Sequence, residues 1–182
     1  MTLDELVTRV SRDVPEAPLL LVKESLQRAQ RQLAEDGNVW TERQSIAVTD
    51  GDPPFSEIIA QTADSEPVRV MQLSVDGSPI EFLQTEPGRL EFKRLPQSDP
   101  EVLLAIRPTT GTNLPEDLLA YWQDGLRHGA LSELFMLPQS WQNPALHEYH
   151  QARFRDSLAR ARMIARGGYQ SRGSRVRPRS FL

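Results

Sequence analysis

The chain of 182 residues contains no cysteine, which excludes a disulfide framework and thiolate chemistry. This absence suits a protein that is made and assembled in a cytoplasm. Aromatic residues make up only 7% of the chain, so a mostly aliphatic core is expected. No apolar run approaches the ~20 residues of a transmembrane helix, and no membrane contact is predicted. Asp4, Glu5 and Arg9 interrupt the first apolar residues, which argues against a cleaved signal sequence.

Motifs of known catalytic chemistry are also missing. The sequence has no phosphate-binding loop, no GxGxxG after a strand and no nucleophile elbow. His147 and His150 have a metal-like spacing on a helix, but one turn of an amphipathic helix explains the same pattern without a third ligand. Asp124 and His128 are i,i+4 neighbours, for which a solvated helical pair is favoured over a base and its orienting group. We predict no enzyme, no metal site and no cofactor.

Charge is distributed very unevenly along the chain. Residues 151–182 hold nine of the 21 basic residues, all of them arginine, and one of the 25 acidic residues, a net charge of +8. Residues 1–150 therefore hold 12 basic and 24 acidic residues, a net charge of −12. An acidic body with a basic tail indicates that the tail contacts something outside its own domain. Arginine favours planar, bidentate contacts to carboxylates, phosphates or carbonyl groups.

The segment 168–182 has too few apolar residues to fold alone. Three interpretations compete for it: a nucleic-acid-binding tail, a solvated tail without a partner, and a tail that docks on another protein. The acidic body opposes the first, and the apolar C-terminal pair favours the third. The residues predicted to dock are Arg172, Arg175, Arg177, Arg179, Phe181 and Leu182.

Two helices are predicted at the start of the chain. Thr2 followed by Glu5 is a capping-box pattern that opens the first helix, and Pro15 ends it. The second helix begins near Pro18 and stops before Gly37. Its predicted apolar stripe comprises Leu19, Val22, Leu26, Ala29 and Leu33.

The region 39–107 has the pattern of five or six short strands joined by tight turns. One strand is predicted over residues 44–49 and another over residues 101–107. Asp76-Gly77 is a hairpin signal, and a strand over residues 79–83 is expected after it. This region therefore predicts a small antiparallel sheet or sandwich.

The third helix is predicted over residues 114–136, with a proline and acidic residues in its first turn. Gly125 and Gly129 lie one turn apart on the side of Trp122. Since each glycine costs a helix about 1 kcal/mol relative to alanine, a close helix contact is expected to compensate. That contact lies either within the subunit or between copies of the chain.

The fourth helix begins at Asn143-Pro144, an N-cap followed by a first-turn proline, and ends at Gly167-Gly168. Its predicted stripe comprises Leu146, Tyr149, Arg153 or Phe154, Leu158, Ala161 and Ala165. A separate basic face is predicted at Arg155, Arg162 and Arg166.

Together these elements predict an α+β fold, a bundle of about four helices with an inserted antiparallel β lobe and an extended basic C-terminal tail. Residues 1–37 and 113–167 form the helical core, residues 38–108 the β lobe, and residues 168–182 the tail.

The two C-terminal helices resemble the head-to-tail adaptor (connector) proteins of tailed bacteriophages. In that family a helix ends near a proline, a Trp-x-Asn/Asp-Pro turn follows, and a long helix leads to a basic tail. The helix from Ala17-Pro18 to Ala29, leading to Trp40, is similar to the opening segment of the family. The other matching residues are Leu114-Pro115, Leu118, Tyr121-Trp122, Gly129-Ala130-Leu131, Leu134, Leu137-Pro138, Trp141 to Leu146, Phe154 and Ala159 to Arg162.

The resemblance covers roughly half of the chain, as a count of matching templates, and implies a homo-oligomeric ring, commonly a dodecamer. Such a ring lies below the portal protein in the neck of the virion and is assembled in the host cytoplasm. The tail would dock on the portal, and the strand lobe would face the tail side, where a tail or nozzle/stopper protein binds, or neighbouring subunits. Double-stranded DNA would pass through the lumen without sequence-specific binding, and an acidic lumen wall would repel it. The alternative is a DNA-binding accessory protein that uses its arginine-rich tail.

Overall fold

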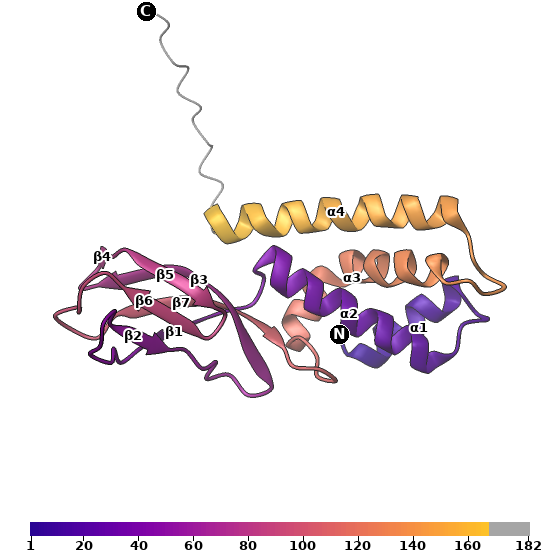
Figure 1. The fold of residues 1–182 in the computed structure, drawn as a ribbon. Coiled ribbons are helices and arrows are strands. Elements are labelled where there is room, and N and C mark those ends of the chain that lie inside the picture. The colour runs from indigo at the N-terminus through magenta and orange to yellow at the C-terminus, as the bar shows by residue number, and fades with distance from the viewer. Residues whose placement is uncertain (168–182) are drawn as a thin grey trace, which may run out of the picture.

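The computed structural model describes residues 1–167 and has the α+β architecture that the sequence predicts. Two helices precede a β lobe and two longer helices follow it, so the lobe is an insertion in a helical body (Figure 1). The helices are α1 (Leu3–Asp13), α2 (Leu19–Gly37), α3 (Glu116–Met136) and α4 (Pro144–Gly167). None of these four helices is long and apolar enough to cross a membrane.

The helix ends follow the predicted signals closely. The side chains of Thr2 and Glu5 form a complete capping box at the start of α1. The prediction for the end of α2 was wrong by one residue. Gly37 is the last helical residue, and Asn38 forms the cap in the left-handed conformation, with φ of 53°. Asparagine tolerates this conformation better than most residues, which explains how the cap forms without glycine.

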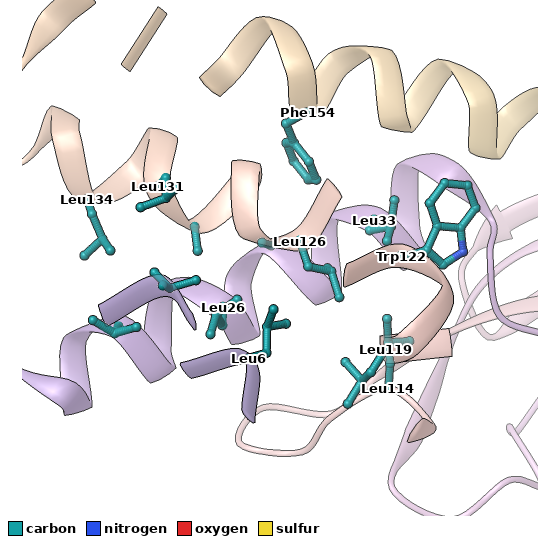
Figure 2. Packing of buried hydrophobic residues seen from close by; sticks show 14 of the residues in the cluster. Leu6, Leu26, Leu33, Leu114, Leu119, Trp122, Leu126, Leu131, Leu134 and Phe154 are labelled. Carbon is teal, nitrogen blue, oxygen red and sulfur yellow. The ribbon is translucent and has the colours of Figure 1, made fainter. Parts of the chain in front are cut away.

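One apolar core joins all four helices of the described chain. Figure 2 shows Phe154 reaching from α4 toward α3, and Leu26 of α2 near Leu6 of α1. Leu6, Leu26 and Leu126 are fully buried. The predicted stripes were too long at their ends, because Leu19 is 65% exposed, Leu146 39% and Tyr149 50%. Leu19 and Leu146 lie in the first turns of α2 and α4, and Tyr149 lies in the second turn of α4.

The β lobe consists of two antiparallel sheets. The strands are β1 (Thr41–Ser45), β2 (Phe55–Glu57), β3 (Ser65–Val75), β4 (Ser78–Pro79), β5 (Phe82–Glu86), β6 (Arg89–Phe92) and β7 (Glu101–Pro108). Sheet A has the order β1-β7-β3-β4, and sheet B has the order β2-β6-β5. A second apolar core, which includes Leu90, Phe92 and Leu104, fills the lobe.

The predicted strand boundaries were only partly right. The Asp76-Gly77 turn joins β3 to β4 as expected, with both residues at positive φ. The strand predicted over residues 44–49 is instead β1, because pairing with β7 runs from Thr41 to Ser45. The strand predicted over residues 79–83 is split. Pro79 ends the pairing in sheet A, and Phe82 begins a new pairing in sheet B.

Candidate functional site

The turn between α3 and α4 is fixed by three hydrogen bonds to the residues that its sequence singles out. Trp141 Nε1 donates to the Leu134 carbonyl at 3.1 Å, and the Asn143 backbone N–H donates to the Phe135 carbonyl at 3.0 Å. The Asn143 side chain accepts from the backbone N–H of Leu146 at 3.1 Å, which is an N-cap. Pro144 is the first residue of α4, and Pro138 lies exposed in the turn. The turn therefore sets the direction in which α4 leaves α3.

Gly125 and Gly129 form the contact between α3 and its neighbours, and this contact lies within the subunit. A Cβ on Gly125 would lie 2.9 Å from the Cβ of Ser157 on α4. A Cβ on Gly129 would lie 2.9 Å from the Cβ of Ala29 on α2 and 3.1 Å from the Phe154 ring on α4. The two distances of 2.9 Å are shorter than a real Cβ atom tolerates, and the distance of 3.1 Å is tight. The glycines thus let α4 approach α3 without a gap.

A third close contact lies at the other end of α4. A Cβ on Gly37, the last residue of α2, would lie 2.8 Å from the Cβ of Ala161. Beside this contact, Arg162 Nε donates to the Asp36 carbonyl at 2.8 Å. Arg162 is exposed like Arg155 and Arg166, with which it was predicted to form a basic face, and it also contacts α2. Trp122 of α3 is buried near this end and lines a small cavity of about 180 Å³ with Ala161.

The exposed arginines of α4 lie along two edges of the helix. On one edge, the guanidinium groups of Arg153 and Arg160 lie 5.5 Å and 5.7 Å from the ring centroids of Tyr149 and Tyr121. Cation–π contacts of this kind hold the charges in place on the surface. On the other edge, Arg155 and Arg166 make no hydrogen bond or ion pair within residues 1–167. Helix α4 lies on the outside of the helical body (Figure 1), and two basic edges border its surface that faces away from the other helices.

The three histidines make contacts between α3 and α4. His150 is buried and its Nδ1 lies 2.7 Å from Nδ1 of His128 on α3, whereas His147 Nδ1 lies 2.7 Å from the carbonyl of Ser132. Among residues 1–167 no group of three or more potential ligands comes together. Burial lowers the pKa of His128 and of His150, and Arg127 lowers both further. His128 and His150 therefore act as a neutral, hydrogen-bonded pair between α3 and α4 near neutral pH.

An ion-pair network joins the β lobe to α2. Glu66 on β3 contacts Arg31 of α2 at 2.7 Å and Arg107 of β7 at 2.8 Å. Arg107 also contacts Glu35 of α2 at 2.6 Å. Burial raises the pKa of Glu66, but the contacts with Arg31 and Arg107 outweigh it, and the net change is a lowered pKa. The network fixes the orientation of the lobe on the helical body.

The C-terminal end of α4 lies beside sheet A. The cavity near Trp122 is also lined by Ala165 of α4, Met71 of β3 and Leu103 of β7. Helix α4 thus ends where the helical body meets the lobe (Figure 1). The predicted docking residues, Arg172, Arg175, Arg177, Arg179, Phe181 and Leu182, lie outside the described residues.

No model of a known protein family matches the chain, and a search of curated proteins finds no significant match.

The sequence predicted the close helix contact at Gly125 and Gly129 and the turn between α3 and α4. It missed the Gly37–Ala161 contact, the His128–His150 pair and the network around Glu66. Each of these joins residues far apart in the chain, and no local pattern in the sequence marks such partners.

Proposed function

We propose that the protein is a structural adaptor subunit of a tailed-bacteriophage neck. Copies of the chain form a ring that joins the portal protein to the tail or a nozzle/stopper protein and lets DNA pass. The ring is part of the virion and is assembled in the host cytoplasm. This role requires a rigid body, a segment that reaches the portal and a surface that does not retain DNA.

One observation carries the proposal. Helix α4 is packed tightly on its neighbours, and in the sequence it is followed directly by the tail, whose basic residues are all arginine. Close contacts at Gly125, Gly129 and Gly37 fasten it to α3 and α2, and the Asn143 cap fixes its start. A helix of 24 residues spans about 36 Å at 1.5 Å per residue. A long, rigid support positions the basic segment at a defined place relative to the body, as docking on a partner requires.

The charge of the body supports the same role. Residues 1–150 carry a net charge of −12, and residues 38–108 contribute half of it, with 12 acidic and six basic residues. Several carboxylates of the lobe, among them Asp50, Glu57 and Asp99, are exposed and have no ion pair within residues 1–167. An acidic surface of this kind repels a polyanion that passes close to it.

Removal of the tail tests the proposal. Both apolar cores lie within residues 1–167, so a chain that lacks residues 168–182 is expected to melt cooperatively like the intact chain. The same truncation is expected to abolish binding to the portal protein of the same phage. Portal binding that survives the truncation would contradict the proposed role of the tail.

The alternative is a DNA-binding accessory protein. Arg155 and Arg166, which have no partner within residues 1–167, and the arginine-rich tail favour it. Replacing Arg175, Arg177 and Arg179 with lysine separates the two functions, because it keeps the charge but removes the bidentate geometry. DNA binding through phosphates would change little and would fall steeply with salt. Docking on the portal would weaken strongly at one fixed salt concentration.

A further inference from the structure

The surface of α4 that faces away from the other helices combines apolar and basic residues. Arg155, Ala159, Met163 and Arg166 are spaced by four, four and three residues, so they lie on one stripe of the helix. All four are exposed, and the Met163 side chain is 69% exposed. We call these four residues the α4 outer face. A methionine between two unpaired arginines has the composition of a protein interface rather than of an idle helix surface.

The outer side of sheet B combines apolar and acidic residues. Strand pairing places Leu83, Glu91 and Phe55 in one row across the sheet. Glu86 and Glu57 flank Arg89 in the next row. Leu90 and Phe92 alternate with these residues and point into the lobe core, so the two rows lie on the opposite side, which we call the sheet B outer face.

The sheet B outer face is left without a partner in the described chain. Leu83 is 62% exposed, and the carboxylates of Glu57 and Glu86 make no ion pair within residues 1–167. Arg89 is already engaged, since its guanidinium lies 4.6 Å from the Phe55 ring centroid and 3.7 Å from Glu91. The face therefore presents an exposed leucine bordered by unpaired acids.

We propose that the α4 outer face of one copy of the chain binds the sheet B outer face of the next copy. Met163 would pack on Leu83, while Arg155 and Arg166 would pair with Glu57 and Glu86. The two faces lie on different parts of the same molecule, so the contact is heterologous. Contacts of this type generate rings when the rotation closes. The inference rests on the proposed ring and names the surfaces through which its subunits meet.

Charge and apolar character together favour a second copy over DNA as the occupant. A phosphate backbone has no apolar group for Met163, whereas the sheet B outer face offers Leu83. The body that carries α4 has a net charge of −12 in residues 1–150 and repels a polyanion. The attraction between copies is local, because Glu57 and Glu86 of the sheet B outer face are opposite in charge to Arg155 and Arg166.

Cysteine trapping tests the contact cleanly because the natural chain contains no cysteine. Two full-length single variants, Ala159→Cys and Leu83→Cys, are mixed at high concentration and oxidised mildly. The expected product is the mixed dimer, in clear excess over the dimer that each variant forms alone. Thr8→Cys on the exposed surface of α1 replaces Ala159→Cys as the control. A mixed-dimer yield equal to that of the control would overturn the proposal.

Reversing the charges of the residues proposed to pair across the contact is a second test. The pair Arg155→Glu and Arg166→Glu, or the pair Glu57→Arg and Glu86→Arg, is expected to lower the trapped yield about tenfold through like-charge repulsion. Combining both pairs in one chain restores opposite charges and is expected to restore the yield. An unchanged yield for the arginine-to-glutamate pair, together with loss of binding to a DNA duplex, would identify a nucleic-acid surface and overturn the proposal.

The outcomes for the contact and for the adaptor function are distinguishable. If a ring forms on the portal but no disulfide joins residues 159 and 83 of neighbouring copies, this contact is rejected and the adaptor function stands. If this disulfide forms but the chain does not assemble on the portal, the contact is supported and the adaptor function is rejected.

Discussion

Gly129 faces the ring of Phe154 so closely that a Cβ at residue 129 would lie 3.1 Å from the ring. The same Cβ would lie 2.9 Å from Ala29, so three helices meet at this point. The backbone of α3 itself forms part of the packing surface for α2 and α4. The absence of a side chain is therefore a packing requirement, and it offsets the lower helix propensity of glycine.

Replacing Gly129 with leucine is expected to lower the free energy of unfolding by roughly 1–3 kcal/mol, because the added atoms overpack the contact. Chemical denaturation measures the change. Ala152→Leu on the exposed side of α4 is the matched control and is expected to change stability by less than about 0.5 kcal/mol. A raised melting temperature for Gly129→Leu would show that residue 129 is not packed against Ala29 and Phe154.

Replacing Asn143 with alanine removes the side-chain acceptor at the start of α4. The expected loss is about 1 kcal/mol of stability, with faster hydrogen exchange in the first turn of the helix. Gln139→Ala in the same exposed turn serves as the control, since its side chain makes no hydrogen bond within residues 1–167. Equal stability of the two variants would mean that the cap contributes nothing.

Glu66→Gln is expected to loosen the β lobe on α2 and to lower stability by about 1 kcal/mol or less at neutral pH. Because the pKa of Glu66 is lowered in the folded protein, the contribution of its charge is present above the unfolded value near 4.5 and is lost as the pH falls below it. The stability curves of the natural chain and the variant should therefore converge in acid. Glu57→Gln, at an exposed residue without an ion pair, should leave the curve unchanged.

The His128–His150 pair is expected to make the protein less stable as the pH falls below about 6.5. Burial lowers both pKa values, so the unfolded chain takes up protons that the folded chain does not, and stability declines until the folded pKa values are reached. Urea denaturation between about pH 7.5 and pH 5 measures the slope. The variant with both histidines replaced by glutamine should have a flatter slope, and an unchanged slope would exclude the pair as its origin.

The helical half of the fold was predictable because its signals are local. The Thr2 capping box, the Asn143 cap and the apolar period of α3 each depend on residues within a few positions of one another. The strands were less predictable because their ends depend on distant partners. β1 ends where its pairing with β7 ends, and the split after Pro79 reflects a change from sheet A to sheet B.

The candidate site shows the same limit. Two glycines one turn apart in a helix indicate a close contact, but the sequence does not say which residues meet them. The structure supplies Ala29, Phe154 and Ser157. The contact of Arg162 with Asp36 was not predicted, because Asp36 lies 126 residues earlier in the chain.

The proposed function requires the chain to assemble into a ring on a portal protein. Native mass spectrometry of the full-length chain, alone and with the portal protein of the same phage, measures this assembly. We expect the free chain to be largely monomeric, because an excess of acid resists self-association. With the portal we expect one complex that holds a fixed, ring-sized number of copies. A chain that stays monomeric with the portal, or that gains mass only when DNA is added, would contradict the proposed function.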